Sequence, residues 1–79
     1  MLTLYGTQGC HLCDDAEMVL KHAQMAISFE WRYIDIALDD DLVKKYGIRI
    51  PVLEKETGQL LNWPFSLLDI QKIMVNDGQ

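Results

Sequence analysis

Apolar and polar residues along the first half of the chain predict two strands with a helix between them. Residues 2–5 form a short apolar run that is typical of a buried strand. From Cys10 to about Ala26, apolar residues recur at three- and four-residue steps, as in an amphipathic helix: Leu12, Ala16, Val19, Leu20, Ala23 and Ile27. Aromatic and β-branched side chains at residues 29–36 predict a second strand. Because a helix separates them, we expect the two strands to form a right-handed parallel unit.

The middle of the chain predicts a short helix followed by a hairpin. Three consecutive aspartates at residues 39–41 supply a helix start, and Gly47 is placed to end that helix. Two short apolar segments, at residues 51–54 and 59–61, flank a polar stretch at residues 55–58. Such a pattern is typical of two strands joined by a tight turn.

A last helix completes the predicted fold. Pro64 suits the first turn of this helix, because proline needs no hydrogen-bond acceptor there. Its buried side is marked by four apolar residues: Leu67, Ile70, Ile73 and Met74. Residues 76–79 are expected to form a frayed tail. The order β-α-β-α-β-β-α predicts an α/β fold with a four-stranded mixed sheet and helices on both faces.

Composition and charge narrow the class of protein. The chain has 79 residues, of which 49% are hydrophobic, so we expect one small globular domain over residues 1–79. The formal net charge is −5 and the seven Lys and Arg residues are scattered, which argues against nucleic acid or an anionic membrane as a partner. No apolar run approaches the roughly 20 residues that span a bilayer, and the chain starts without signal-peptide features. We expect a cytoplasmic protein that acts as a monomer.

The candidate chemistry lies in Gly9-Cys10-His11-Leu12-Cys13, which contains both cysteines of the chain. This C-x-x-C stands where the first predicted strand turns into the first predicted helix. The unpaired N–H groups and the dipole of a helix amino terminus favour the thiolate form of a cysteine. A cytosolic C-x-x-C is more often catalytic or metal-binding than a structural staple. We therefore predict a dithiol–disulfide redox site in which Cys10 is the nucleophile and Cys13 the resolving thiol.

Several neighbours of the dithiol have two open interpretations. His11 either lowers the pKa of the nucleophile or is an exposed imidazole that replaces another residue type. Asp14 and Asp15 add negative charge near the thiolate and oppose the helix dipole. Trp63 either borders a substrate groove or belongs to the core. Tyr5 either contacts substrate or only packs against neighbouring side chains.

Three segments carry a likeness to a known family. Residues 4–13 place a strand, a loop and a dithiol in the order seen in glutaredoxins, and residues 45–53 are similar to the segment around the cis-proline of thioredoxin. Residues 63–65, Trp-Pro-Phe, precede the last predicted helix. Together with the element order, these segments resemble the thioredoxin superfold in its minimal, glutaredoxin-like form. The C-x-x-C-D start and the W-P-F segment resemble a group of small bacterial glutaredoxin-like proteins.

The resemblance implies a substrate site beside the dithiol. It implies a cis peptide bond between Ile50 and Pro51, which leaves the backbone of Ile50 free to hold an extended peptide or glutathione. We further expect His11, Arg49 and Trp63, together with Ile50 and Pro51, to bind substrate.

The chain departs from the glutaredoxin pattern at the usual glutathione anchors. Thr7 stands where glutaredoxins usually carry a lysine, and residues 62–66 stand where they usually carry a Gly-Gly pair followed by an acid. Arg49 remains to meet a carboxylate. Leu4 stands near the place of thioredoxin's buried carboxylate and cannot take a proton. Glutathione as a co-substrate is therefore left open.

We expect a thiol–disulfide oxidoreductase that acts on a disulfide-containing protein or a small thiol substrate, is reduced by an unknown donor, and needs no cofactor. One alternative is a carrier for Cu(I) or Zn, bound by the C-x-x-C with His11 as a third ligand. A second is an inactive adaptor that recognises a partner through a groove near Ile50 and Trp63. A [2Fe–2S] cluster shared between two subunits, as some glutaredoxins hold, is a further alternative.

Overall fold

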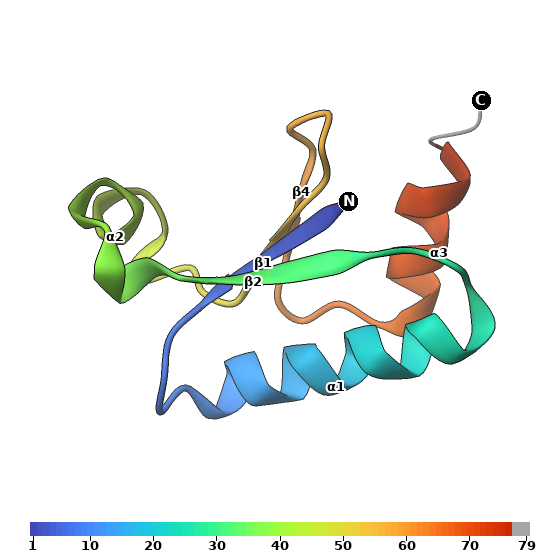
Figure 1. The fold of residues 1–79 in the computed structure, drawn as a ribbon, viewed down its shortest axis with the longest axis horizontal. Helices are drawn as coiled ribbons and strands as arrows, with labels where there is room; N and C mark the ends of the chain where they lie inside the picture. Colours follow the sequence, from blue (N-terminus) through green and yellow to red (C-terminus); the bar gives the residue numbers. More distant parts are fainter. Residues whose placement is uncertain (77–79) are drawn as a thin grey trace.

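Strands and helices follow one another in the order expected from the sequence. The structure is a computed structural model that describes the backbone of residues 1–76 and the side chains of residues 1–74. Its elements are β1 (Leu2–Gly6), α1 (His11–Ala26), β2 (Trp31–Asp35), the 3-10 helix η1 (Ile36–Leu38), α2 (Asp40–Tyr46), β3 (Val52–Glu54), β4 (Leu60–Asn62) and α3 (Leu67–Asn76) (Figure 1). Apart from Asn76, which ends α3, the predicted tail at residues 76–79 lies outside the described residues. Within residues 1–76, no helix has the length and apolar character needed to cross a membrane.

The four strands form one mixed sheet in the order β2-β1-β3-β4. β1 and β2 are parallel, with Leu4 opposite Tyr33. β3 is antiparallel to both β1 and β4. The structure therefore confirms the predicted parallel unit, the predicted hairpin and the four-stranded mixed sheet.

Helices cover both faces of this sheet. α1 and α3 lie on the same face (Figure 1), and the core between them and the sheet consists of Leu2, Leu4, Ala16, Leu20, Ala23, Leu53, Phe65, Ile70 and Ile73. α2 packs at one end of the opposite face, where Tyr46 stacks on Tyr5 with ring centroids 4.6 Å apart. Among the described residues, the buried Tyr46 hydroxyl has no hydrogen-bond partner.

The buried stripe of α1 differs from the prediction at its first turn. Leu12 was expected to face the core, but its side chain is 49% exposed, whereas Cys13 is fully buried. The stripe then continues through Ala16, Leu20 and Ala23. Cys13 continues this stripe at a three-residue step from Ala16, so Leu12 lies one residue, or about 100°, away from it.

The short helix and the hairpin form as their local signals predict. The Asp39 carboxylate caps α2 by accepting hydrogen bonds from the N–H groups of Asp41 and Leu42. In the hairpin turn, the N–H of Gly58 donates to the carbonyl of Lys55 at 2.8 Å, and Gly58 has a positive φ of 95°.

Pro64 lies outside α3, so its predicted place in the first helical turn was wrong. α3 begins at Leu67, because Ser66 and Asp69 form a reciprocal cap. The Asp69 carboxylate accepts from the N–H of Ser66 at 2.9 Å, and the Ser66 hydroxyl accepts from the N–H of Asp69 at 3.4 Å. Leu67, expected on the buried side, is 37% exposed.

Lys55 connects the hairpin to α3. Its side chain is only 5% exposed, and its ammonium donates a hydrogen bond to the carbonyl of Ile73 at 2.7 Å. A cation near the carboxyl end of a helix also interacts favourably with the helix dipole. This contact therefore helps to hold α3 against the sheet.

Candidate redox site

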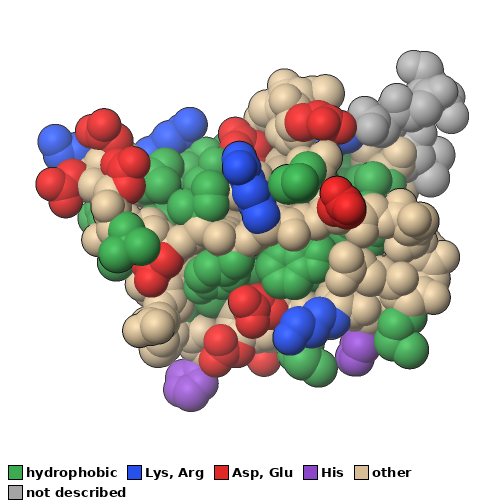
Figure 2. Space-filling view, in the orientation of Figure 1, with side chains coloured by type: hydrophobic (Ala, Val, Ile, Leu, Met, Phe, Trp, Pro, Cys, Tyr) green, Lys and Arg blue, Asp and Glu red, His purple; other side chains and the backbone are tan. Residues whose placement is uncertain are grey.

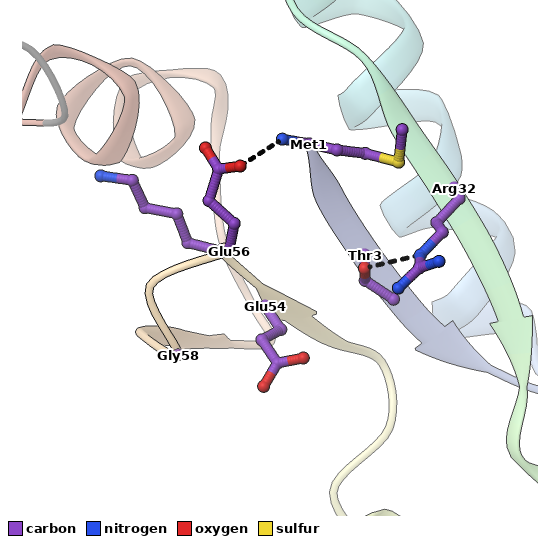
Figure 3. Close-up of a pocket in the computed structure, with 7 residues that line it drawn as sticks. Met1, Thr3, Arg32, Glu54, Glu56 and Gly58 are labelled. Atoms are coloured by element: carbon purple, nitrogen blue, oxygen red, sulfur yellow. Dashed lines mark hydrogen bonds and ion pairs between the residues drawn. The ribbon is translucent and has the colours of Figure 1, made fainter.

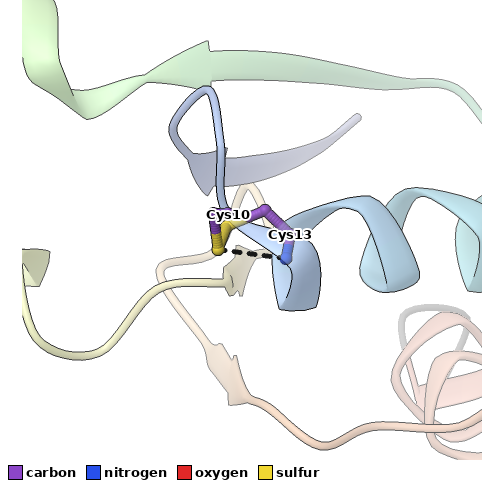
Figure 4. The surroundings of a disulfide bond; sticks show 2 residues. All are labelled: Cys10 and Cys13. Atoms are coloured by element: carbon purple, nitrogen blue, oxygen red, sulfur yellow. Dashed lines mark hydrogen bonds between the residues drawn. A yellow bond between two sulfur atoms is a disulfide. The ribbon is translucent and has the colours of Figure 1, made fainter.

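The two cysteines lie at the junction between β1 and α1. A loop of residues 7–9 leaves the end of β1, and Gly9 turns the chain with a positive φ of 80°. Cys10 is the N-cap residue of α1, and its sulfur accepts a hydrogen bond from the backbone N–H of Cys13 at 3.1 Å. The Cα atoms of Cys10 and Cys13 are 5.2 Å apart, and the two sulfurs form a disulfide (Figure 4). The pair that the sequence singled out is therefore close enough to cycle between dithiol and disulfide.

The two sulfurs differ in their access to solvent. Cys10 is half-buried, whereas Cys13 is fully buried. The sulfur of Cys10 also accepts a free N–H group at the amino end of α1, which is a favourable place for negative charge.

Gly6, the last residue of β1, allows α1 to approach the sheet closely. A Cβ atom at this position would lie 3.0 Å from the sulfur of Cys13 and 2.6 Å from the hydroxyl of Tyr33. Real Cβ atoms essentially never come closer than 3.0 Å to another group, so a larger residue would displace the Tyr33 hydroxyl or shift the backbone. Neither Gly6 nor Tyr33 was among the site residues predicted from the sequence. Their proximity to the sulfur depends on strand register.

The pairing of the strands brings other predicted site residues to the same end of the sheet. Val52 pairs with Tyr5 near the end of β1, so Pro51 directly precedes β3 where the chain enters the dithiol loop. Asn62 pairs with Val52, so Trp63 leaves β4 at this same end. Pro51 is buried, and the peptide bond between Ile50 and Pro51 is cis.

The remaining predicted residues are positioned as follows. His11 is exposed at the first position of α1. Arg49 is exposed, donates from Nη2 to the side-chain oxygen of Asn62 at 3.4 Å, and lies 5.8 Å from the ring centre of Tyr46. Trp63 is half-buried and packs edge-on against Phe65, with ring centroids 5.1 Å apart.

Tyr5 packs on the face of the sheet opposite to α1. Its ring stacks on Tyr46, and its hydroxyl donates to a carboxylate oxygen of Glu54 at 2.8 Å. Burial, followed by this hydrogen bond and the charge of Glu54, raises the pKa of Tyr5 to about 12. Of the two interpretations left open by the sequence, the structure favours packing.

The surroundings of the dithiol are acidic. Figure 2 shows acidic side chains gathered around the amino-terminal half of α1, which carries Asp14, Asp15 and Glu17. Burial raises the pKa of Tyr33, and the charges of Glu17, Asp35 and Asp14 raise it further. The phenol of Tyr33 therefore keeps its proton throughout the neutral range.

Metal ligands are sparse around the dithiol. Within the part of the chain that the structure describes, no group of three or more His, Cys, Asp or Glu side chains could hold a metal ion. A soft metal at this site would therefore depend on Cys10 and Cys13 themselves.

A separate pocket lies at the opposite end of β1 (Figure 3). It has a volume of about 400 Å³ and is lined by Met1, Thr3, Arg32, Glu54, Lys55, Glu56 and Gly58. On its walls, the amino group of Met1 pairs with the Glu56 carboxylate at 3.3 Å, and Arg32 donates from Nε to the Thr3 hydroxyl at 3.1 Å. No residue of the dithiol site contributes to this pocket.

Comparison with known proteins places this chain among glutaredoxin-like domains. Over 96% of its length it is 34% identical to XcR50 of X. campestris, of which it covers 97%, with a TM-score of 0.85 for the X-ray structure. Protein Ne2328 of Nitrosomonas europaea is 30% identical over 91% of this chain and 87% of its own, with a TM-score of 0.78. Thioredoxin 1 of Thermosipho africanus, at 10% identity, covers 99% of this chain and 98% of its own with a TM-score of 0.67, and shares the fold alone.

No curated protein matches the chain. The family described as "Glutaredoxin-like domain (DUF836)" matches residues 1–74, which is nearly the whole chain. This protein therefore belongs to that family, and it has the thioredoxin-like fold with a C-x-x-C pair at disulfide distance.

Proposed function

We propose that this protein is a thiol–disulfide oxidoreductase in which Cys10 attacks and Cys13 resolves. The observation that carries the proposal is the unequal environment of the two sulfurs. The half-buried Cys10 sulfur accepts a backbone N–H at the amino end of α1, and Cys13 is fully buried behind it. An attacking thiol needs access and a stabilised thiolate, whereas a resolving thiol needs only to reach the first sulfur.

In the first step, the Cys10 thiolate attacks one sulfur of a substrate disulfide. A new bond forms between Cys10 and that sulfur, and the other substrate sulfur leaves as a thiolate that takes a proton from solvent. The N–H of Cys13 and the helix dipole stabilise the Cys10 thiolate before the attack.

In the second step, the Cys13 thiolate attacks the Cys10 sulfur of this mixed disulfide. The bond between Cys10 and the substrate breaks, and the substrate sulfur leaves with the electron pair. The protein is now oxidised to the Cys10–Cys13 disulfide, and the substrate is reduced. An external thiol donor must then reduce the protein before another turnover.

We assign substrate binding to the loops that share the dithiol end of the sheet. Ile50 and Pro51 precede β3 there and Trp63 follows β4. An extended segment of a disulfide-containing protein, or a small thiol, would lie along the backbone of Ile50. Arg49 would attract a substrate carboxylate, and His11 would contact the substrate beside the attacking sulfur.

Trapping the mixed disulfide tests the proposal. The Cys13→Ser variant removes the resolving sulfur, so with insulin or glutathione disulfide it should accumulate a covalent adduct, seen as a mass increase that dithiothreitol reverses. The Cys10→Ser variant, which keeps one cysteine, is the matched control and should accumulate no adduct. If both variants reduce insulin at the wild-type rate, or if Cys10→Ser forms the adduct instead, the proposed roles are wrong.

A further inference from the structure

Tyr33 brings a hydroxyl group close to the buried sulfur of the dithiol. Tyr33 pairs with Leu4 in the parallel β1–β2 ladder, and its ring packs against the core between the sheet and α1. Its hydroxyl and the sulfur of Cys13 lie 2.6 and 3.0 Å from the same point, the place of a Cβ atom on Gly6. Because Gly6 has no side chain, the hydroxyl of Tyr33 and the sulfur of Cys13 can both approach this point on β1.

The sulfur of Cys13 needs such a neighbour when it carries charge. Cys13 is fully buried, and burial in apolar surroundings disfavours a thiolate. The backbone N–H of Cys13, in the first turn of α1, donates to the sulfur of Cys10 and not to that of Cys13. Leu4, on the strand beneath the helix, offers neither a proton nor a hydrogen bond.

The charges around Tyr33 make its hydroxyl a donor. Burial raises its pKa, and the charges of Glu17 and Asp14 on α1 and of Asp35 on β2 raise it further. The phenol therefore stays protonated at neutral pH. The same carboxylates oppose a negative charge on the nearby sulfur. In the disulfide form, the Tyr33 hydroxyl makes no hydrogen bond to any of the described residues, so its proton is available to the sulfur after reduction.

We propose that the Tyr33 hydroxyl donates a hydrogen bond to the Cys13 sulfur in the reduced protein and thereby positions and stabilises the resolving thiolate. This inference rests on the proposed function. In the resolving step, the Cys13 proton goes to solvent, the Cys13–Cys10 bond forms, and the electron pair of the broken bond leaves on the substrate sulfur. Tyr33 keeps its own proton throughout, so it is a positioning residue for Cys13.

The Tyr33→Phe substitution tests this role because it removes only the hydroxyl. In the Cys10→Ser background, where Cys13 titrates alone, thiolate absorbance against pH should show the pKa of Cys13 raised by about one unit. With Cys10 restored, single-turnover release of substrate from the mixed disulfide should slow about tenfold at pH 7. The rate should approach that of the unsubstituted protein above the pKa of Cys13. Tyr5→Phe, which removes a hydroxyl from the opposite face of the sheet, should change neither quantity.

A second measurement needs no substitution at Tyr33. By reciprocity, the pKa of Tyr33, followed by NMR of labelled tyrosine, should be higher in the reduced protein than in the oxidised protein. Equal Tyr33 pKa values in the reduced and oxidised proteins would overturn the inference. So would a Cys13 pKa that is the same with and without the Tyr33 hydroxyl. These titrations do not depend on turnover. If the Tyr33→Phe substitution shifts the Cys13 pKa but the wild-type protein reduces no disulfide, the inference is supported and the proposed function is refuted. If the wild-type protein is active but the substitution leaves the Cys13 pKa unchanged, the proposed function is supported and the inference is refuted.

Discussion

At the scale of single residues, the absence of a side chain at Gly6 determines how the dithiol is built. The glycine leaves room beside the backbone of β1 for the sulfur of Cys13 and the hydroxyl of Tyr33. The packing is tight enough that one added methyl group would force a neighbour to move. Small-to-large changes in such places usually destabilise a fold.

We therefore expect Gly6→Ala to lower the free energy of unfolding by about 1–3 kcal/mol, measured by urea denaturation. The shortest clash would be with the Tyr33 hydroxyl, at 2.6 Å. The same substitution should consequently cost less in a Tyr33→Phe background. An equal loss in both backgrounds would mean that the hydroxyl is not what limits the space.

At the scale of elements, local signals located the helices and strands well but placed some boundaries wrongly. The three- and four-residue spacing of apolar residues was sufficient to predict α1, although Cys13 and not Leu12 continues its buried stripe. Proline suits a first helical turn, which is why the sequence predicts Pro64 there. The reciprocal bonds of Ser66 and Asp69 start α3 beyond it instead. Serine and aspartate three residues apart are a recognisable cap in the sequence, but the prediction rested on Pro64 and did not use them.

The cap of α3 has a measurable energetic effect. Ser66→Ala removes the hydroxyl that accepts from the N–H of Asp69, and we expect it to destabilise the protein by about 1 kcal/mol in thermal or urea unfolding. Ser28→Ala, at an exposed serine between α1 and β2, is the matched control and should change stability little. Comparable losses from the two substitutions would show that the cap contributes nothing specific.

At the scale of the whole molecule, topology explains which parts of the site were predictable. The dithiol is a local motif, so the sequence alone located it. The meeting of Pro51 and Trp63 at the dithiol end follows from the strand order implied by the family resemblance. The proximity of the Tyr33 hydroxyl to Gly6 depends on the register of β1 against β2. This register cannot be read from the local sequence around either residue.

The stability of the oxidised protein should fall between pH 10 and 12 because of Tyr5. In the unfolded chain this phenol ionises near its ordinary pKa of 10, whereas in the folded protein its pKa is raised to about 12. Ionisation therefore favours the unfolded state in this range, and the stability present below pH 10 is lost as the pH rises. Urea unfolding at pH 8, 10 and 11 should show a smaller decline for Tyr5→Phe than for the wild type. Parallel declines would contradict this assignment.

The hydrogen bond to the attacking sulfur comes from a main-chain amide, namely the N–H of residue 13. Every amino acid except proline supplies that group, so exchanging the side chain at this position leaves the electrostatic support of Cys10 in place. Evolution can thus convert a two-cysteine site into a one-cysteine site by a single replacement, while the remaining sulfur keeps its activation. Variation in reactivity among such descendants would then arise from the neighbouring side chains, such as His11 and Asp14, and not from loss of the donor.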